Sequence, residues 1–401
     1  MAKSNFGSET QNYDKTPTSR ILANYKIMKY YLIAGEASGD LHASNLMKEL
    51  KKKDGTAEFR FWGGDLMQDV GGELVKHYRD LAFMGFLEVV ANLKTILGNI
   101  KFCKNDILEY KPDALILIDY PGFNLRIAEF AHNAGFKVFY YISPQVWAWK
   151  KSRVHKIKRF IDRMFVILPF EKDFYAKYDY EVDFVGHPLL DMIEQLPGND
   201  TESFVKENNL PEKPVIALLP GSRKQEIKKM LPVMLSVTKY FDNYRFVIAG
   251  APSVEKEFYD ELTTGTDAAI VFNKTHALLR NSYAALVTSG TATLETALFE
   301  VPEVVCYKGS PVSYFIARLV IDKEIIKYIS LVNLIMGKEI VKELIQSELT
   351  AGNLKEELLK ITGDETNRKR MKEDFTRLKK KLGGAGASEK TAELIVKIIK
   401  T

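Results

Sequence analysis

Asp119 is the residue whose position best suits proton transfer. It directly follows Ala114–Ile118, five apolar residues that predict a buried strand, so its carboxyl group would lie at the end of that strand. Ligands of open α/β sheets bind at such ends, and apolar surroundings raise the pKa of a carboxyl group toward the value that suits a general base for a hydroxyl group. The alternative is a cap on the turn at Pro121 or on a helix predicted for Phe123–Ala134, and spacing alone favours the cap.

Two glycine-containing turns later in the chain predict an anion site. Each follows an apolar run and precedes a helical pattern, in Leu218–Ile227 and in Val287–Ala297. Free backbone N–H groups, a helix dipole and a guanidinium would together hold a diphosphate, and a glutamate one turn into the second helix could accept hydrogen bonds from ribose hydroxyls. The alternative is that both are ordinary strand-to-helix turns. The presence of two such turns in one predicted domain makes this alternative less attractive. The candidate residues are Gly221, Ser222, Arg223, Ser289, Gly290, Thr291 and Glu295.

A third turn, Ala34–Asp40, lies between an apolar strand and the helical pattern Leu41–Leu50. It would also expose N–H groups at the end of a strand, but it lacks the Gly-x-Gly-x-x-Gly spacing of dinucleotide-binding turns. Ser38 or Asp40 could equally well cap the helix. A ligand-binding role and a capping role therefore have similar weight for this turn.

An apolar stripe at helical spacing predicts either a packed helix or a lipid-contacting surface. It runs from Phe86 to Ile100 with polar residues between its members, and for an arbitrary α/β protein the packed helix is favoured. Seven cations between Lys150 and Arg163 would suit anionic lipid headgroups, although a solvated helix face is the default interpretation. The candidate lipid-contacting residues are Phe86, Val89, Val90, Leu93, Ile96 and Leu97.

Two parallel sheets are predicted to position these turns. From Met28 onward, short β-branched or aromatic runs alternate with helical patterns, which is typical of repeated βα units, and the alternation restarts after a polar stretch at 195–200. We therefore expect two Rossmann-like domains and a helical tail that docks on them. The predicted strands are Lys29–Ala34, Glu58–Trp62, Ala114–Asp119, Lys137–Ile142, Arg163–Leu168, Glu181–Val185, Val215–Leu219, Arg245–Ala249, Ala268–Phe272, Ala284–Thr288 and Val304–Tyr307.

Composition excludes several other classes of protein. Of the 401 residues, 57 are Lys or Arg and 52 are Asp or Glu, and 46% are hydrophobic, which is ordinary globular composition. The net charge of +5 without a basic-aromatic pattern gives no support to nucleic-acid binding, and no apolar run reaches the roughly 18 residues of a membrane span. The two cysteines lie far apart and the six histidines are scattered, so neither a disulfide framework nor a metal site is predicted.

Seven motifs in order along the chain resemble the lipid-A-disaccharide synthases, the glycosyltransferases of bacterial lipid A biosynthesis. The resemblance extends from about Lys29 to the C-terminus, although Gly122 and Glu303 are less typical of the family. Each motif alone is modestly specific, whereas seven in sequence are strongly specific. The motifs are Ala34–Asp40, Asp119–Asn124, Ser143–Trp149, Val185–Pro188, Leu219–Arg223, Ser289–Glu295 and Ser330–Asn333.

The resemblance implies a GT-B fold, in which two Rossmann-like domains face a cleft and the C-terminal helix crosses back to the first domain. The first domain would comprise 28–186 and about 376–401, and the second 187–375, after a disordered extension at 1–27. The implied reaction transfers a sugar from UDP-2,3-diacylglucosamine to the 6-hydroxyl of 2,3-diacylglucosamine 1-phosphate (lipid X), with inversion and with neither a metal nor another cofactor. The products would be UDP and a β(1→6) disaccharide phosphate.

The resemblance also assigns roles. Asp119 would be the base, with Glu36 or Asp40 as alternatives, and Arg223 would offset charge on the departing UDP. Because both substrates carry acyl chains, the stripe that begins at Phe86 becomes better explained as a lipid-contacting surface. The enzyme would be peripheral to the cytoplasmic face of the inner membrane. A homodimer through the C-terminal region is also implied. A UDP-sugar epimerase of the same architecture is the nearest alternative. The residues implied to line or support the cleft are Glu36, Ser38, Asp40, Asn124, Gln145 and Asn333.

Overall fold

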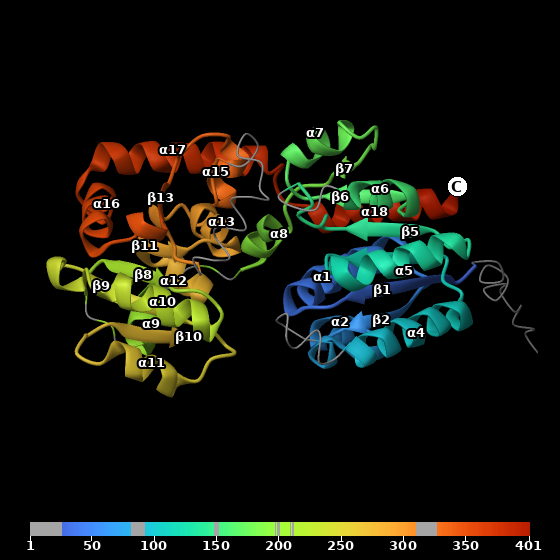
Figure 1. Ribbon diagram of the computed structural model, residues 1–401, viewed down its shortest axis with the longest axis horizontal. Coiled ribbons are helices and arrows are strands. Elements are labelled where there is room, and N and C mark those ends of the chain that lie inside the picture. The colour runs from blue at the N-terminus through green and yellow to red at the C-terminus, as the bar shows by residue number, and fades with distance from the viewer. Residues whose placement is uncertain are drawn as a thin grey trace, which may run out of the picture.

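The computed structural model describes residues 26–81, 93–147, 152–196, 198, 201–208, 210, 212–309 and 327–401 of the chain. It consists of two lobes, each built around one sheet with helices packed on it (Figure 1). All paired strands in both sheets run parallel, as the alternating strand and helix patterns predict. The predicted α/β fold with two Rossmann-like sheets is therefore confirmed.

The first sheet has the strand order β3-β2-β1-β4-β5-β6-β7. Its central strand β1 is buried on both faces, because Tyr30 and Leu32 belong to one hydrophobic cluster while Tyr31 and Ile33 belong to another. Strands that are covered on both faces require continuous apolar runs, which is what the sequence provides. The strands are β1 (Met28–Ala34), β2 (Ala57–Gly63), β3 (Glu73–His77), β4 (Ala114–Ile118), β5 (Val138–Tyr141), β6 (Arg163–Val166) and β7 (Asp183–Phe184).

Helices cover both faces of the first sheet. Buried residues of α1 and α18 share the cluster that contains Tyr30, and buried residues of α4 and α5 share the cluster that contains Tyr31. The helices of this lobe are α1 (Ala37–Lys53), α2 (Asp65–Val70), α4 (Leu93–Tyr110), α5 (Pro121–Asn133), α6 (Arg153–Phe160), α7 (Phe170–Ala176) and α18 (Ala387–Lys400), with a 3₁₀ turn at Tyr78–Asp80.

The second sheet has the strand order β10-β9-β8-β11-β12-β13. Its strands are β8 (Val215–Leu219), β9 (Arg245–Gly250), β10 (Ala269–Phe272), β11 (Ser282–Thr288), β12 (Glu303–Tyr307) and β13 (Lys342–Ile345). The helices between β7 and α18 are α8 (Pro188–Gln195), α9 (Thr201–Glu207), α10 (Lys224–Leu235), α11 (Lys256–Thr263), α12 (Thr275–Arg280), α13 (Thr291–Leu298), α15 (Leu331–Met336), α16 (Ala351–Gly363) and α17 (Glu365–Lys381), with 3₁₀ turns at Thr238–Tyr240 and Gln346–Glu348.

The strands β3 and β13 are missing from the prediction. Both lie at the edge of a sheet, and both carry charged residues, such as Glu73 and Lys76 in β3 and Lys342 and Glu343 in β13. Edge strands need no continuous apolar run and often carry charges, so their sequences resemble those of loops.

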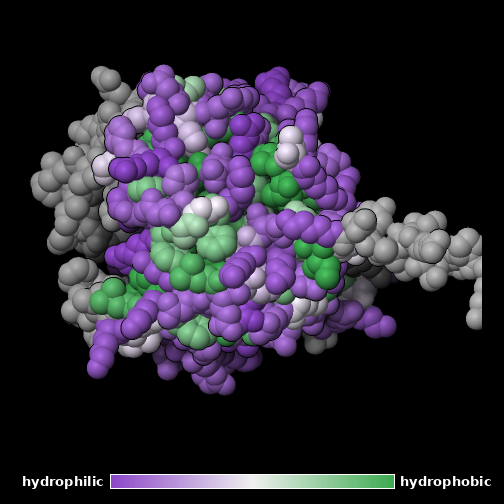
Figure 2. Space-filling view, turned by 90° about the vertical axis from the view of Figure 1, so that its right-hand side faces the viewer, coloured by the Kyte–Doolittle hydropathy of each residue, from purple (hydrophilic) through white to green (hydrophobic). Residues whose placement is uncertain are grey.

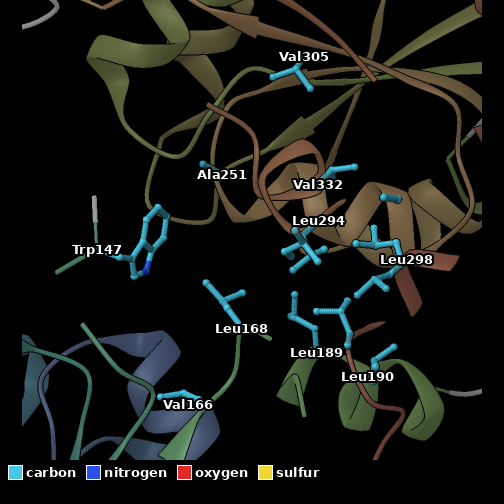
Figure 3. Close-up of a cluster of buried hydrophobic side chains, with 14 of the residues drawn as sticks. Trp147, Val166, Leu168, Leu189, Leu190, Ala251, Leu294, Leu298, Val305 and Val332 are labelled. Atoms are coloured by element: carbon cyan, nitrogen blue, oxygen red, sulfur yellow. The ribbon is translucent and has the colours of Figure 1, made fainter. Parts of the chain in front are cut away.

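An apolar cluster joins the two lobes (Figure 3). Leu168, which follows β6, and the α8 residues Leu189 and Leu190 lie opposite Leu294 and Leu298 of α13, and all five are buried in one cluster. The lobes therefore share a hydrophobic contact in addition to the connecting chain.

The C-terminal helix returns to the first lobe, as predicted. The chain leaves α17 through Gly383, Gly384 and Gly386, which all have positive φ, and α18 then packs beside α1. The Asp191 carboxylate in α8 accepts hydrogen bonds from the N–H groups of Gly386, Ala387 and Ser388 at 2.6, 3.2 and 3.1 Å. These bonds satisfy free N–H groups at the start of α18 and fix its position.

Candidate active site

The chain bends sharply at the carboxyl end of β4. Asp119 and Tyr120 have φ of 42° and 50°, a left-handed conformation that costs a residue other than glycine about 1–2 kcal/mol. Two side chains hold the bend: Nδ2 of Asn124 donates to the Asp119 carbonyl oxygen at 2.7 Å, and the Tyr140 hydroxyl donates to the same oxygen. Helix α5 has Tyr120 at its N-cap and no side-chain cap, so Asp119 does not have the capping role that spacing alone favours.

The environment of the Asp119 carboxyl group raises its pKa to about 6. Burial is the main cause and the negative charge of Glu36 is the second, while the hydrogen bond from the Tyr120 N–H group acts in the opposite direction. A carboxylate with this pKa is mostly ionised at neutral pH but is more basic than an exposed aspartate. Asp119 therefore has the electrostatics of a general base.

The turn after β1 packs against the turn after β4. A Cβ atom at Gly35 would lie 2.3 Å from the ring of Tyr120, so only glycine permits this close approach. Glu36 and Ser38, in the same turn, are exposed, and so is Gln145 beyond β5. These three predicted cleft residues are accessible to a ligand at the carboxyl edge of the sheet.

The Asp40 side chain is buried, and its carboxylate accepts hydrogen bonds from the N–H groups of Gly64, Leu66 and Met67 at 2.8, 3.1 and 3.1 Å. These bonds anchor the start of α2. Because both oxygen atoms accept backbone hydrogen bonds there, Asp40 has a supporting role, and Glu36 is the stronger alternative to Asp119 as the base.

The two predicted asparagines require a correction. Both Asn124 and Asn333 are fully buried. The Oδ1 atom of Asn333 accepts from the N–H groups of Ile340 and Val341, and its Nδ2 donates to the Val341 carbonyl and to Glu343. Asn124 supports the backbone at Asp119, as described above. Each asparagine therefore positions a loop and does not line the cleft.

The predicted anion-binding residues come together in the second lobe. Gly221, Ser222 and Arg223 after β8, and Ser289, Gly290 and Thr291 after β11, line one cavity of about 330 Å³ at the carboxyl ends of the two adjacent strands. The positive φ of Gly221, +113°, turns the chain there, and a Cβ atom would meet the Glu226 carboxylate at 2.8 Å. Backbone N–H groups and a guanidinium around such a cavity suit the oxygens of a diphosphate.

Glu295 lies one turn into α13, outside the residues that line this cavity. It is 3.7 Å from Nε2 of His276, and its charge reaches His42 of α1 in the first lobe, where burial nevertheless lowers the pKa of His42 to about 4. Glu295 therefore lies where the lobes approach each other.

Among the residues that the structure describes, no group of three or more His, Cys, Asp or Glu could hold a metal ion.

Tyr140 is a positioning residue that the sequence analysis missed. It is fully buried in β5, opposite Leu117 of β4, and its hydroxyl reaches the Asp119 carbonyl oxygen. Its sequence signal is a tyrosine in an otherwise apolar strand, which would have predicted a buried hydroxyl in need of a partner. Only the pairing of β4 with β5 identifies that partner.

The apolar stripe is described only in part. Phe86, Val89 and Val90 lie outside the described residues, Leu93 begins α4, Ile96 is partly buried and the Leu97 side chain is 54% exposed. Figure 2 shows this end of the molecule as mainly hydrophilic, with separate apolar groups on it. Within the described ranges, no helix is long and apolar enough to cross a membrane.

The fold and the site together define a class of protein. Two lobes, each built around a parallel sheet covered by helices, are the GT-B arrangement. Solved structures agree on the fold: a UDP-GlcNAc 2-epimerase from Neisseria meningitidis bound to UDP-GlcNAc has a TM-score of 0.64 at 14% identity, covering 92% of this chain and 100% of that one. The calicheamicin glycosyltransferase CalG4 has a TM-score of 0.58 at 14% identity, covering 94% and 99%.

Sequence comparison then identifies the family. The model of the family described as lipid-A-disaccharide synthetase matches residues 30–399. The lipid-A-disaccharide synthase of Syntrophus aciditrophicus is 38% identical over 92% of this chain and 97% of its own length, and that of Nitrosococcus oceani is 37% identical over 92% and 95%. The chain belongs to the lipid-A-disaccharide synthetase family, so it is a glycosyltransferase of lipid A biosynthesis.

Proposed function

We propose that the chain transfers 2,3-diacylglucosamine from its UDP derivative to the 6-hydroxyl of 2,3-diacylglucosamine 1-phosphate. The observation that carries this proposal is the Asp119 carboxyl group, which lies partly buried at the end of β4 with a pKa raised to about 6. A transfer to a hydroxyl group needs a base of this strength beside the acceptor. An epimerase of the same fold has no acceptor hydroxyl to activate.

In the proposed reaction, Asp119 removes the proton of the acceptor 6-hydroxyl as its oxygen attacks the anomeric carbon of the donor. The new carbon–oxygen bond forms on the face opposite the bond to UDP, which breaks with its electron pair remaining on the diphosphate. A single displacement of this kind inverts the anomeric configuration from α to β. The products are a β(1→6) disaccharide phosphate and UDP, and the proton stays on Asp119 until it exchanges with solvent.

The anion cavity of the second lobe supports the donor half of the proposal. Arg223 and the N–H groups of the turns at Gly221 and Gly290 would offset the charge that develops on the departing diphosphate. We propose that this guanidinium makes a divalent metal unnecessary. Glu295 would accept hydrogen bonds from the ribose hydroxyls at the edge of the same site.

We also propose that the first lobe contacts the cytoplasmic face of the inner membrane. On α4, Leu97, Phe102 and Leu108 are 54%, 51% and 45% exposed, which suits contact with acyl chains. Replacing Leu97 and Phe102 by serine should reduce co-sedimentation with anionic vesicles several-fold. The matched control is Leu359→Ser on α16 of the other lobe, which removes a leucine with 46% exposure and should leave binding unchanged. An equal loss of vesicle binding in both variants would contradict the proposal that α4 contacts the membrane.

The first experiment measures UDP release and product mass from UDP-2,3-diacylglucosamine, with and without 2,3-diacylglucosamine 1-phosphate. Formation of a tetraacyl disaccharide phosphate only in the presence of the acceptor supports the proposal. UDP release or sugar isomerisation without disaccharide would favour the epimerase. A homodimer through the C-terminal region is a separate proposal, which light scattering of the purified protein tests.

A further inference from the structure

A second cavity, of about 500 Å³, lies beside the bend at Asp119. Tyr120 and Pro121, which follow Asp119 directly, line it. A ligand in this cavity would therefore lie next to the base, on the side of the first lobe. None of the roles assigned above uses this cavity.

One part of the cavity wall is apolar. Leu81, Ile96, Phe123 and Leu125 line it, and three of these side chains are buried, with Ile96 partly buried. The Tyr120 hydroxyl is 3.4 Å from the Leu81 carbonyl oxygen, which closes this side of the wall. Such a wall would contact hydrocarbon and would offer a phosphate or a sugar hydroxyl little in return.

The rest of the rim is cationic. Arg126 of α5 and Arg153 and Lys156 of α6 line the same cavity. Lys156 pairs with Glu129 at 3.1 Å on the surface, whereas neither arginine has an ion-pair partner within the described part of the chain. Guanidinium groups bind phosphate through paired hydrogen bonds, so two of them at one rim suit a phosphate better than any uncharged group.

Arg153 also lies within electrostatic range of the residue that holds the base in place. Burial raises the pKa of the Tyr140 hydroxyl, and the positive charge of Arg153 acts against that rise. The same hydroxyl donates to the Asp119 carbonyl oxygen. The charge of Arg153 is therefore felt by the side chain that holds the Asp119 backbone.

We propose that this cavity binds the acceptor, with its phosphate on Arg126 and Arg153 and the start of an acyl chain on the apolar wall. This inference rests on the proposed function. The phosphate is on C1 and the 6-hydroxyl is on the carbon attached to C5, and C1 and C5 both flank the oxygen of one rigid ring. A phosphate fixed at the rim therefore restricts where the hydroxyl can lie, and we propose that this placement brings it to Asp119. The cavity would then select an acyl sugar phosphate over the same sugar without its phosphate.

The test compares two acceptors, 2,3-diacylglucosamine 1-phosphate and its dephosphorylated analogue, in wild type and in the double variant Arg126→Ala/Arg153→Ala. The matched control is Arg159→Ala, which removes an exposed cation from the same helix outside the cavity. In the double variant, the preference for the phosphorylated acceptor should fall at least about tenfold, with the KM of the UDP-sugar unchanged. The control should keep the wild-type preference.

Equilibrium binding of each acceptor to the UDP-loaded protein, by isothermal titration calorimetry in detergent, separates this inference from the proposed function. If wild type forms no disaccharide, the proposed function fails, but loss of phosphate-dependent binding in the double variant still supports the cavity. An undiminished preference in the double variant overturns the inference. An equal loss in Arg159→Ala also overturns it, because general attraction of anionic lipid to α6 would then explain the result. If the melting temperature of the double variant falls, the single variant Arg126→Ala, at an exposed position, is used in its place.

Discussion

The two sheets carry ligand-binding turns at the same topological position but build them from different residues. After β4, two non-glycine residues adopt left-handed conformations and place a partly buried carboxyl group at the carboxyl end of the strand. After β8 and β11, glycine-containing turns line an open cavity, and Arg223 lies at its wall. Asn124 and Tyr140 hold the first turn through its backbone carbonyl. In the second, Glu226 accepts from the Ser222 N–H group at 3.3 Å and lies 3.7 Å from Arg223.

The difference follows from the chemistry that each turn can perform. A base needs removal from water, because burial raises the pKa of a carboxyl group, and the backbone strain that this requires must be offset by buried hydrogen bonds. An anion cavity needs accessible N–H groups, which glycine provides by allowing close approach. In the proposed reaction, one fold that is present twice would serve proton transfer in one lobe and diphosphate binding in the other.

The largest expected effect is on turnover when the base is removed. Asp119→Asn keeps the size of the side chain but cannot accept a proton, so kcat should fall by roughly 10²–10⁴-fold. The Kd for UDP, measured by isothermal titration calorimetry, should remain at its wild-type value because the anion cavity is in the other lobe. Normal turnover in this variant would move the base to another residue, with Glu36 examined first.

Loss of the guanidinium should instead weaken nucleotide binding. Arg223→Ala removes a charge-assisted contact worth about 1.5–3 kcal/mol, so the Kd for UDP should rise roughly tenfold to a hundredfold and turnover should fall with it. Lys224→Ala is the control, since Lys224 pairs with Glu255 at 2.5 Å and lies outside the residues that line the cavity. If the control weakens UDP binding equally, net charge rather than a specific contact holds the nucleotide.

The two cavity glycines should respond differently to substitution. Gly221→Ala strains a backbone with φ of +113° and pushes a Cβ atom against Glu226, costing about 1–3 kcal/mol in stability or in UDP affinity. Gly290 has φ of 161°, which any residue can adopt, and no atom lies within 4 Å of a Cβ built there. Thermal unfolding should therefore be unchanged in Gly290→Ala. If Gly221→Ala raised the Kd for UDP less than Gly290→Ala did, contact with the ligand and not backbone conformation would set the requirement for glycine.

The smallest expected effect is a shift in pH dependence. Because Asp119 must be ionised to act, kcat should fall as the pH decreases through about 6. Glu36→Gln removes the neighbouring negative charge that raises the pKa of Asp119, so the acidic limb of the pH profile should move to lower pH, by less than about one unit. Because burial remains the main cause of the raised pKa, the midpoint of the acidic limb should stay above the ordinary pKa of aspartate. A shift to higher pH would contradict the electrostatic assignment.

Local pattern was sufficient for much of the fold. The continuous apolar runs predicted the central strands, with β8 predicted to the residue, and the break at Gly383–Gly386 was found where the prediction expected it. The edge strands β3 and β13 were missed because strands that carry charged residues lack a continuous apolar run. The contacts of Asp40 and Asn333 could not be predicted, because a motif reveals that a polar residue is required and not which atoms it contacts.

The sequence by itself determined the two series of βα units, the glycine turns and the carboxyl group at the end of β4, since each depends on residues close together in the chain. Only the tertiary structure decided that β1 and β4 are neighbours, and this pairing brings Glu36 to Asp119 and Gly35 to Tyr120. Packing within each lobe likewise buries Asp40 in the first and Asn333 in the second, and it assembles a cavity from α5 and α6. Burial and charge at a point depend on every segment that packs there, and the pKa of Asp119 is therefore a property of the folded chain.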